Sequence, residues 1–167
     1  MKTGIYLSYV GLGANLLHLS YCHQVAKKYG PVTIITLCKN LEAALADDPL
    51  IEEVFYIDKY HKKLIDIFNL AKVLKSFDFK NLLIFYPSIR LYLSAKLAGI
   101  KNVSIYNIFK KKNLHLVRAA KKLTEDFLHI NNCPTETNFF VNNDELKKVN
   151  KEFANNKFKI VIGAGSS

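Results

Sequence analysis

Short apolar runs, most of them unbroken rather than alternating with polar residues, recur along the chain and are separated by stretches with helical spacing. The runs occupy residues 5–9, 32–37, 54–57, 82–85, 103–106 and 160–162. Unbroken apolar strands are typical of a parallel sheet that is covered by helices on both faces. We therefore predict an α/β chain with a doubly wound, Rossmann-like parallel sheet.

The segments between these runs carry apolar residues at spacings of three and four, as amphipathic helices do. We expect helices over residues 16–29, 64–77, 89–98 and 116–130. A shorter helix is expected around residues 146–153, with Asn143 or Asp144 as its cap.

Composition limits the size of the fold and its compartment. The 167 residues, of which 50% are hydrophobic, suit one domain with a substantial core. The cysteines are odd in number and scattered, so we expect no disulfide framework and a reducing compartment. No stretch approaches the ~20 apolar residues of a membrane span. We predict a cytoplasmic protein.

The chain is basic, with 24 Lys and Arg residues against 14 Asp and Glu residues, a formal balance of 24 − 14 = +10. A basic domain attracts phosphates, carboxylates, nucleic acid or an anionic membrane surface. The densest cluster is Lys110, Lys111 and Lys112, which follow a predicted strand and would suit an anionic substrate at the sheet edge. The alternative is a Lys-rich composition without a partner. Nucleic acid is not an expected partner, because no recognised nucleic-acid-binding motif is present.

The first apolar run leads into the loop Gly11-Leu12-Gly13-Ala14-Asn15. A strand that enters such a loop and then a helix brings backbone N–H groups and the positive end of a helix dipole toward an anion. We predict that Gly11, Gly13 and Asn15 belong to a ligand site; the alternative is that the glycines serve only a tight turn. Leu16 stands at the third glycine position of a dinucleotide fingerprint, so no nicotinamide or flavin cofactor is expected.

His18 lies close to this loop and is a candidate general base, because the ordinary pKa of histidine is near neutral. The alternative is a histidine of the core. His18 and Cys22 have the i, i+4 spacing of zinc ligands, but no second pair at ligand spacing follows. We therefore predict no metal site.

A second strand-and-loop unit closes the chain, where residues 160–162 lead into a Gly/Ser loop. We expect residues 1–156 to form one Rossmann-like domain and residues 157–167 to be the first strand and loop of another. The backbone N–H groups of this loop are predicted to hold a phosphate. The predicted residues are Gly163, Gly165, Ser166 and Ser167.

The order and spacing of these motifs resemble the amino-terminal half of family 9 glycosyltransferases, which include the ADP-heptose:lipopolysaccharide heptosyltransferases. The resembling segments span nearly the whole chain: the glycine turn with its helix, then residues 31–35, 46–54, 81–84 leading to Ser88-Ile89-Arg90, 95–101 and 160–167. The resemblance implies a GT-B architecture, in which two Rossmann-like domains face each other across a cleft. The amino-terminal domain would bind the acceptor and the other domain the nucleotide sugar.

The resemblance also implies inverting transfer without a metal or other cofactor. The implied acceptor-binding residues are Gly11, Gly13, Asn15, Arg90, Lys110, Lys111 and Lys112. An acidic acceptor such as the lipopolysaccharide inner core would match the cations among them, and the protein would work in the cytoplasm in peripheral contact with the inner membrane face. The Gly163–Ser167 loop would contact the nucleotide-sugar donor.

Two positions depart from the family pattern. Ala14 stands where the family carries an Asp that deprotonates the acceptor, and Ser20 stands where it carries a Pro. Alanine has no group that can act as a base. Either His18 has taken over this role, or a residue of the second domain supplies it, or the protein is a non-catalytic saccharide- or partner-binding domain. We expect the chain alone to transfer no sugar, because the donor domain is missing from it.

Overall fold

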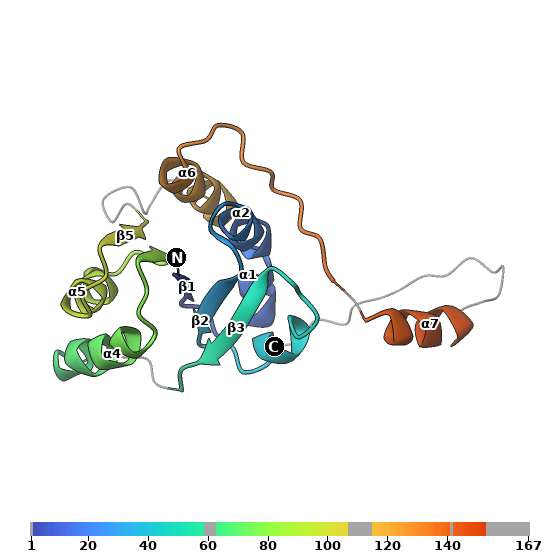
Figure 1. Ribbon diagram of the computed structural model, residues 1–167, viewed down its shortest axis with the longest axis horizontal. Helices are drawn as coiled ribbons and strands as arrows, with labels where there is room; N and C mark the ends of the chain where they lie inside the picture. The colour runs from blue at the N-terminus through green and yellow to red at the C-terminus, as the bar shows by residue number, and fades with distance from the viewer. Residues whose placement is uncertain (1, 59–62, 107–114, 141, 153–167) are drawn as a thin grey trace.

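The structure is a computed structural model that describes residues 2–58, 63–106, 115–140 and 142–152. Its centre is a sheet of five parallel strands in the order β3-β2-β1-β4-β5 (Figure 1). The strands are β1 (Thr3–Leu7), β2 (Val32–Thr36), β3 (Ile51–Tyr56), β4 (Asn81–Ile84) and β5 (Asn102–Ile105). The doubly wound parallel sheet predicted from the sequence is confirmed.

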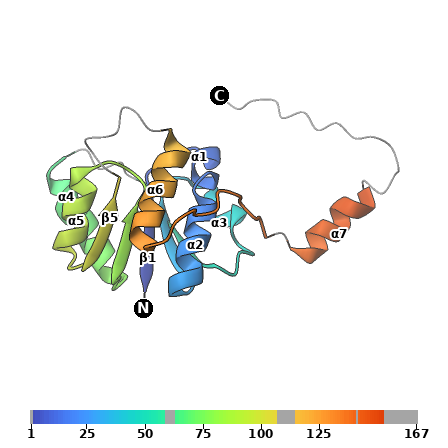
Figure 2. The same ribbon diagram turned by 90° about the horizontal axis from the view of Figure 1, so that it is seen from above.

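Helices cover both faces of this sheet (Figures 1 and 2). Helices α2 (Leu19–Tyr29) and α6 (Leu116–Leu128) lie on one face, and α4 (Ile65–Ser76) and α5 (Ile89–Leu97) on the other. Two short helices, α1 (Leu12–Leu16) and α3 (Leu41–Ala44), follow β1 and β2, while α7 (Asn143–Glu152) lies apart from the sheet (Figure 2).

The apolar runs are unbroken because each central strand is buried on both faces. In β1, Ile5 and Leu7 pack in the core beneath α2 and α6, whereas Tyr6 packs in the core beneath α4 and α5. Successive side chains of a strand point to opposite faces, so a strand between two helical layers is mostly apolar on both faces.

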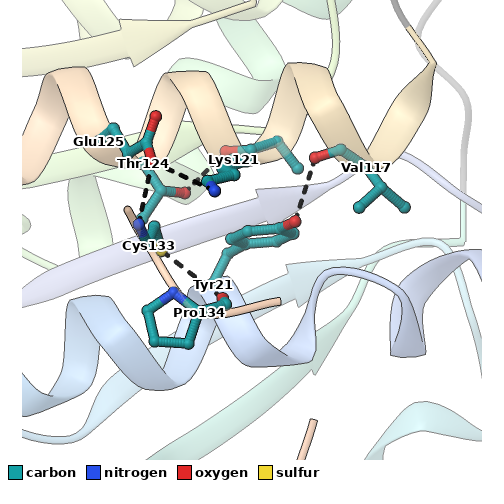
Figure 3. Close-up of polar contacts among 8 residues, drawn as sticks. Tyr21, Val117, Lys121, Thr124, Glu125, Cys133 and Pro134 are labelled. Carbon is teal, nitrogen blue, oxygen red and sulfur yellow. Dashed lines mark hydrogen bonds and ion pairs between the residues drawn. The ribbon is translucent and has the colours of Figure 1, made fainter. Parts of the chain in front are cut away.

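Polar contacts join α6 to α2 and the segment after α6 to α6, as Figure 3 shows. The Tyr21 hydroxyl donates to the Val117 carbonyl at 3.0 Å. After α6 the chain turns at His129, whose φ of 55° is left-handed. The Cys133 N–H then donates to Glu125 Oε1 at 2.9 Å. These bonds hold α6 against α2 and the segment after α6 against α6.

A buried pair ties α2 to the loop before β3. His23 Nε2 lies 2.6 Å from Asp48 Oδ2, and Asp48 Oδ1 accepts a hydrogen bond from the Leu50 N–H. Asp48 belongs to the 46–54 segment of the family resemblance. Its contacts give that part of the motif a structural role.

Several predicted boundaries need correction. The strand expected at residues 54–57 is β3 (Ile51–Tyr56), which begins three residues earlier. The strand expected at residues 5–9 is β1, which begins and ends two residues earlier. The helix expected over residues 16–29 is broken, because the His18 N–H bonds to the Asn15 carbonyl three residues back, a 3₁₀ spacing. Asn142, rather than Asn143 or Asp144, supplies the side-chain oxygen that accepts from the Asp144 N–H at the start of α7. The predicted strand at 160–162 and the domain boundary at 156/157 lie outside the described residues.

Gly4 provides a test of the packing around β1. A Cβ at this position would lie 2.8 Å from Phe79 Cε2 and 2.9 Å from Leu82 Cδ1, both on buried side chains. We expect Gly4→Ala to lower the free energy of unfolding by about 1–3 kcal/mol, because overpacking forces neighbouring side chains to shift.

The matched control is Gly13→Ala, whose Cβ meets nothing within 4 Å and lies in α1. Urea unfolding should show the control unchanged or up to about 1 kcal/mol more stable. Equal losses in both variants would contradict this packing.

Candidate functional site

The strand order reverses between β1 and β4, and this point locates the candidate site. From β1 the chain builds β2 and β3 on one side and later β4 and β5 on the other. In open α/β sheets, ligands bind outside the carboxyl ends of the strands at such a switch point. Two segments of the predicted site meet there: the glycine loop after β1 and the amino-terminal end of α5 after β4.

Asn15 holds the glycine loop from inside. Its side-chain amide donates to the carbonyls of Tyr9 at 2.9 Å and Gly11 at 2.7 Å, and its oxygen accepts from the Thr36 hydroxyl at 3.0 Å. The side chain is buried, since the residue is 1% exposed. These bonds brace the loop against the end of β2. A direct contact between Asn15 and an acceptor stays a prediction, and the geometry favours the bracing role.

Gly11 and Gly13 have no structural need to be glycine. Neither has a left-handed φ, and a Cβ at either position would meet no atom within 4 Å. The tight-turn alternative therefore lacks support, because neither the backbone conformation nor the packing excludes a side chain. Both residues lie at the exposed surface of the loop. The open space above them suits the close approach of a ligand.

His18 lies beneath this loop and is 0% exposed. Its Nδ1 is 2.7 Å from the Ala14 carbonyl and its Nε2 is 2.9 Å from the Tyr106 hydroxyl. The carbonyl can only accept, so in the neutral ring Nδ1 carries the hydrogen and Nε2 accepts from Tyr106. The ring also stacks on Tyr9, with centroids 5.0 Å apart. Both ring nitrogens are thus occupied by the protein itself.

Burial determines the protonation state of this cluster. It lowers the pKa of His18 to about 4, although the hydrogen bond to Ala14 acts in the opposite direction. Burial also raises the pKa of Tyr9 to about 12 and raises that of Tyr106. The histidine is therefore neutral at pH 7, and the tyrosines keep their protons. This arrangement favours the core-histidine alternative, in which His18 positions the loop.

The lowered pKa of His18 predicts how stability depends on pH. In the unfolded chain His18 binds a proton near pH 6.5, whereas in the folded chain it does so only near pH 4. The contribution of neutral His18 to the free energy of unfolding is therefore complete above about pH 6.5 and is lost as the pH falls toward 4. This difference corresponds to about 3 kcal/mol. We expect urea unfolding of His18→Gln to show a flatter pH dependence than the wild type over this range. Parallel curves for the two proteins would contradict the assignment.

A pocket of about 320 Å³ opens at the carboxyl ends of β1 and β4, between α4 and α5. Ser88 caps α5, accepting from the Leu91 N–H at 3.4 Å, so the positive end of the helix dipole faces the pocket. Its lining combines hydroxyls, charged groups and apolar side chains: Tyr6, Ser8, Lys63, Asp66, Ile67, Leu70, Pro87, Ser88, Ile89, Arg90, Leu91 and Ser94.

The pocket contains one of the predicted acceptor-binding residues and two residues that sequence reasoning missed. Arg90, which the family resemblance singled out, lines it together with Lys63 and Asp66. Asp66 Oδ2 accepts from the Lys63 N–H at 2.8 Å, so this carboxylate is hydrogen-bonded to the backbone just before α4. In the sequence, Lys63 belongs to a stretch with the pattern of a solvated loop. Only the crossover from β3 to β4 brings it beside Arg90.

Other predicted site residues fall outside the described part of the chain. Lys110, Lys111 and Lys112 lie in the undescribed stretch 107–114, and Gly163, Gly165, Ser166 and Ser167 in the stretch 153–167. Within the described ranges, no group of three or more His, Cys, Asp or Glu side chains could hold a metal ion. No described helix has the length and apolar character needed to cross a membrane.

The sheet order and its helical layers define an α/β domain of the Rossmann-like type, and two solved structures share this fold. E. coli ADP-heptose LPS heptosyltransferase II matches with a TM-score of 0.59 and 16% identity, over 92% of this chain and 51% of that one. A family 9 glycosyl transferase from Veillonella parvula DSM 2008 matches with a TM-score of 0.61 and 12% identity, over 92% of this chain and 49% of that one.

The chain thus spans about half the length of these proteins. At such identities the likeness establishes the fold, and it confirms the resemblance in fold to heptosyltransferases that the sequence predicts. No protein-family model matches the chain, and no curated protein matches it significantly.

Proposed function

We propose that this chain is the acceptor-side half of a glycosyltransferase of the heptosyltransferase type. The transferase moves a sugar from a nucleotide-sugar donor to an anionic, lipopolysaccharide-like glycan. The observation that carries the proposal is the pocket at the switch point, where two cations, Arg90 and Lys63, outnumber one carboxylate, Asp66, in a fold that two glycosyltransferase structures share over 92% of this chain. No cofactor or metal enters the proposed reaction.

The pocket has the chemistry of a subsite for an acidic acceptor. Arg90 can form two parallel hydrogen bonds with a carboxylate or phosphate, and Lys63 adds a second cation. The amino-terminal end of α5 contributes a positive dipole. The hydroxyls of Ser8 and Ser88 can orient sugar hydroxyls in the same space. Lys110, Lys111 and Lys112 are proposed to extend this positive surface.

The glycine loop is proposed to take the reacting end of the acceptor. Gly11 and Gly13 leave the backbone open there, and Asn15 and His18 hold that backbone in place from below. The donor is assigned to the segment that contains Gly163, Gly165, Ser166 and Ser167. Their N–H groups would stabilise the charge of the leaving diphosphate.

Proton removal from the acceptor needs a group other than Ala14. His18 could supply it only if its bond to Tyr106 opened, since its Nε2 accepts from that hydroxyl at 2.9 Å. We therefore assign the base to a residue outside the described part of the chain and give His18 a positioning role.

A non-catalytic saccharide-binding domain is the second candidate function. Alanine at position 14 and the occupied ring of His18 favour it, because no described group of the glycine loop is then a base. Both candidate functions include binding of a saccharide, but only the glycosyltransferase would also transfer a sugar.

The binding test compares Arg90→Gln and Lys63→Gln with the control Arg118→Gln on the opposite helical layer. Titration calorimetry with a phosphorylated, carboxylate-bearing inner-core oligosaccharide measures affinity. We expect each pocket variant to bind about tenfold more weakly, since a charge-assisted hydrogen bond contributes about 1.5–3 kcal/mol. The salt dependence of binding should weaken as well. Affinities equal to that of the control would remove the pocket from the acceptor site.

The activity test uses the full-length protein that carries this chain, with ADP-heptose as the probe donor. We expect the wild type to transfer and His18→Gln to lose less than about tenfold in turnover, because His18 positions the loop and transfers no proton in the proposed reaction. A loss of ~10²–10⁴ in His18→Gln with unchanged unfolding would instead make His18 the base. If only Ala14→Asp transfers, the natural protein is a non-catalytic binding domain. A base worth ~10²–10⁴ in rate makes these outcomes easy to separate.

A further inference from the structure

Helices α4 and α5 turn a row of large apolar side chains away from the core. On α5, Ile89, Leu93 and Leu97 follow at i, i+4 and i+8 and form one stripe. We call the whole surface the α4–α5 face. Its six apolar residues are each between 44% and 74% exposed: Leu64, Ile65, Phe68, Ile89, Leu93 and Leu97.

The fold itself does not use these side chains. The inner sides of the two helices already supply the core, through Leu70 and Leu74 on α4 and Leu91 and Ala95 on α5. The helices lie side by side on the same layer, and Figures 1 and 2 show no other described element against their outer side. Large apolar side chains that are exposed together on one helical layer favour an interaction site.

Cations surround the apolar row. Lys72 and Lys75 are exposed along α4, and Lys96 is exposed on α5. Lys63 and Arg90 lie at the amino-terminal ends of the two helices, beside the pocket. On the two helices the only acidic residue is Asp66, whose carboxylate accepts from the Lys63 N–H just before α4. The surface is therefore both apolar and strongly positive.

We propose that the α4–α5 face docks onto the surface of an anionic lipid bilayer. Apolar side chains that enter the headgroup region, with lysines and arginines around them, are the two features of interfacial membrane binding. A second copy of the chain is a poorer occupant, because a two-fold contact through this face would bring the same cations together. The proposal gives the peripheral membrane contact expected from the sequence a defined surface.

Docking through this face would place the pocket at the membrane surface, because Ile89 belongs to both and the pocket residues Lys63 and Arg90 lie at the ends of the same helices. A lipid-anchored glycan could then reach the pocket without leaving the bilayer. This last step rests on the proposed function, whereas membrane docking itself does not.

Vesicle co-sedimentation of the full-length protein tests the docking without donor or acceptor. The probes are vesicles of phosphatidylethanolamine with phosphatidylglycerol, and vesicles of phosphatidylcholine alone. We expect binding to the anionic vesicles, reduced about tenfold or more in the double variant Phe68→Ser/Leu93→Ser, because both side chains leave water on docking. The double variant Lys72→Gln/Lys75→Gln should lose about fivefold for each lysine removed.

The matched control is Leu146→Ser/Val149→Ser, which removes two similarly exposed apolar residues from α7. It should bind like the wild type. Equal binding to neutral vesicles, or a larger loss in the α7 control, would overturn the proposal. A wild type that ignores anionic vesicles would overturn it too, as would a dimer in sedimentation that Phe68→Ser/Leu93→Ser dissociates. Sugar transfer to a soluble, delipidated acceptor separates the two proposals. If the α4–α5 variants keep this transfer, the proposed function stands even where docking fails.

Discussion

The central position of β1 is the constraint on which the rest of the structure depends. This strand pairs in parallel with β2 on one side and β4 on the other, and it is buried on both faces. Its backbone therefore has no free edge, and its side chains have no contact with solvent. The glycine loop, the switch point and the pocket all follow from where β1 ends.

A small set of buried hydrogen bonds from Asn15 and His18 fixes the glycine loop above the end of β1. Asn15 ties the loop to the end of β2, and His18 ties Ala14 to Tyr106 at the end of β5. Each buried polar atom in these bonds has a partner, so this set of bonds holds the exposed backbone above it without side-chain support from the outside. The surface at Gly11 and Gly13 is thus both ordered and open, as a binding site requires. The same bonds make His18 unsuitable as a base in this conformation.

Helices α4 and α5 each contribute to three different surfaces of the protein. The inner side of α4 and α5 completes the core, their amino-terminal ends line the pocket, and their outer side carries apolar residues among cations. The proposed glycan pocket and the proposed membrane-docking face lie on the same two helices, so together they would suit one substrate with a polar head and a lipid anchor.

The sequence by itself determined the order and type of the main elements, because unbroken apolar runs such as 32–37 have few solutions other than a buried parallel strand. It also predicted that Arg90 and the glycine loop lie at the same edge of the sheet, where the strands end. Tertiary structure decided what each residue does there. Whether His18 faces a ligand or the core depends on Tyr106, 88 positions away, and Lys63 lines the same pocket as Arg90 only because the chain crosses over from β3 to β4. Periodicity reports burial along one element, whereas these roles arise from contacts between elements that are distant in the chain.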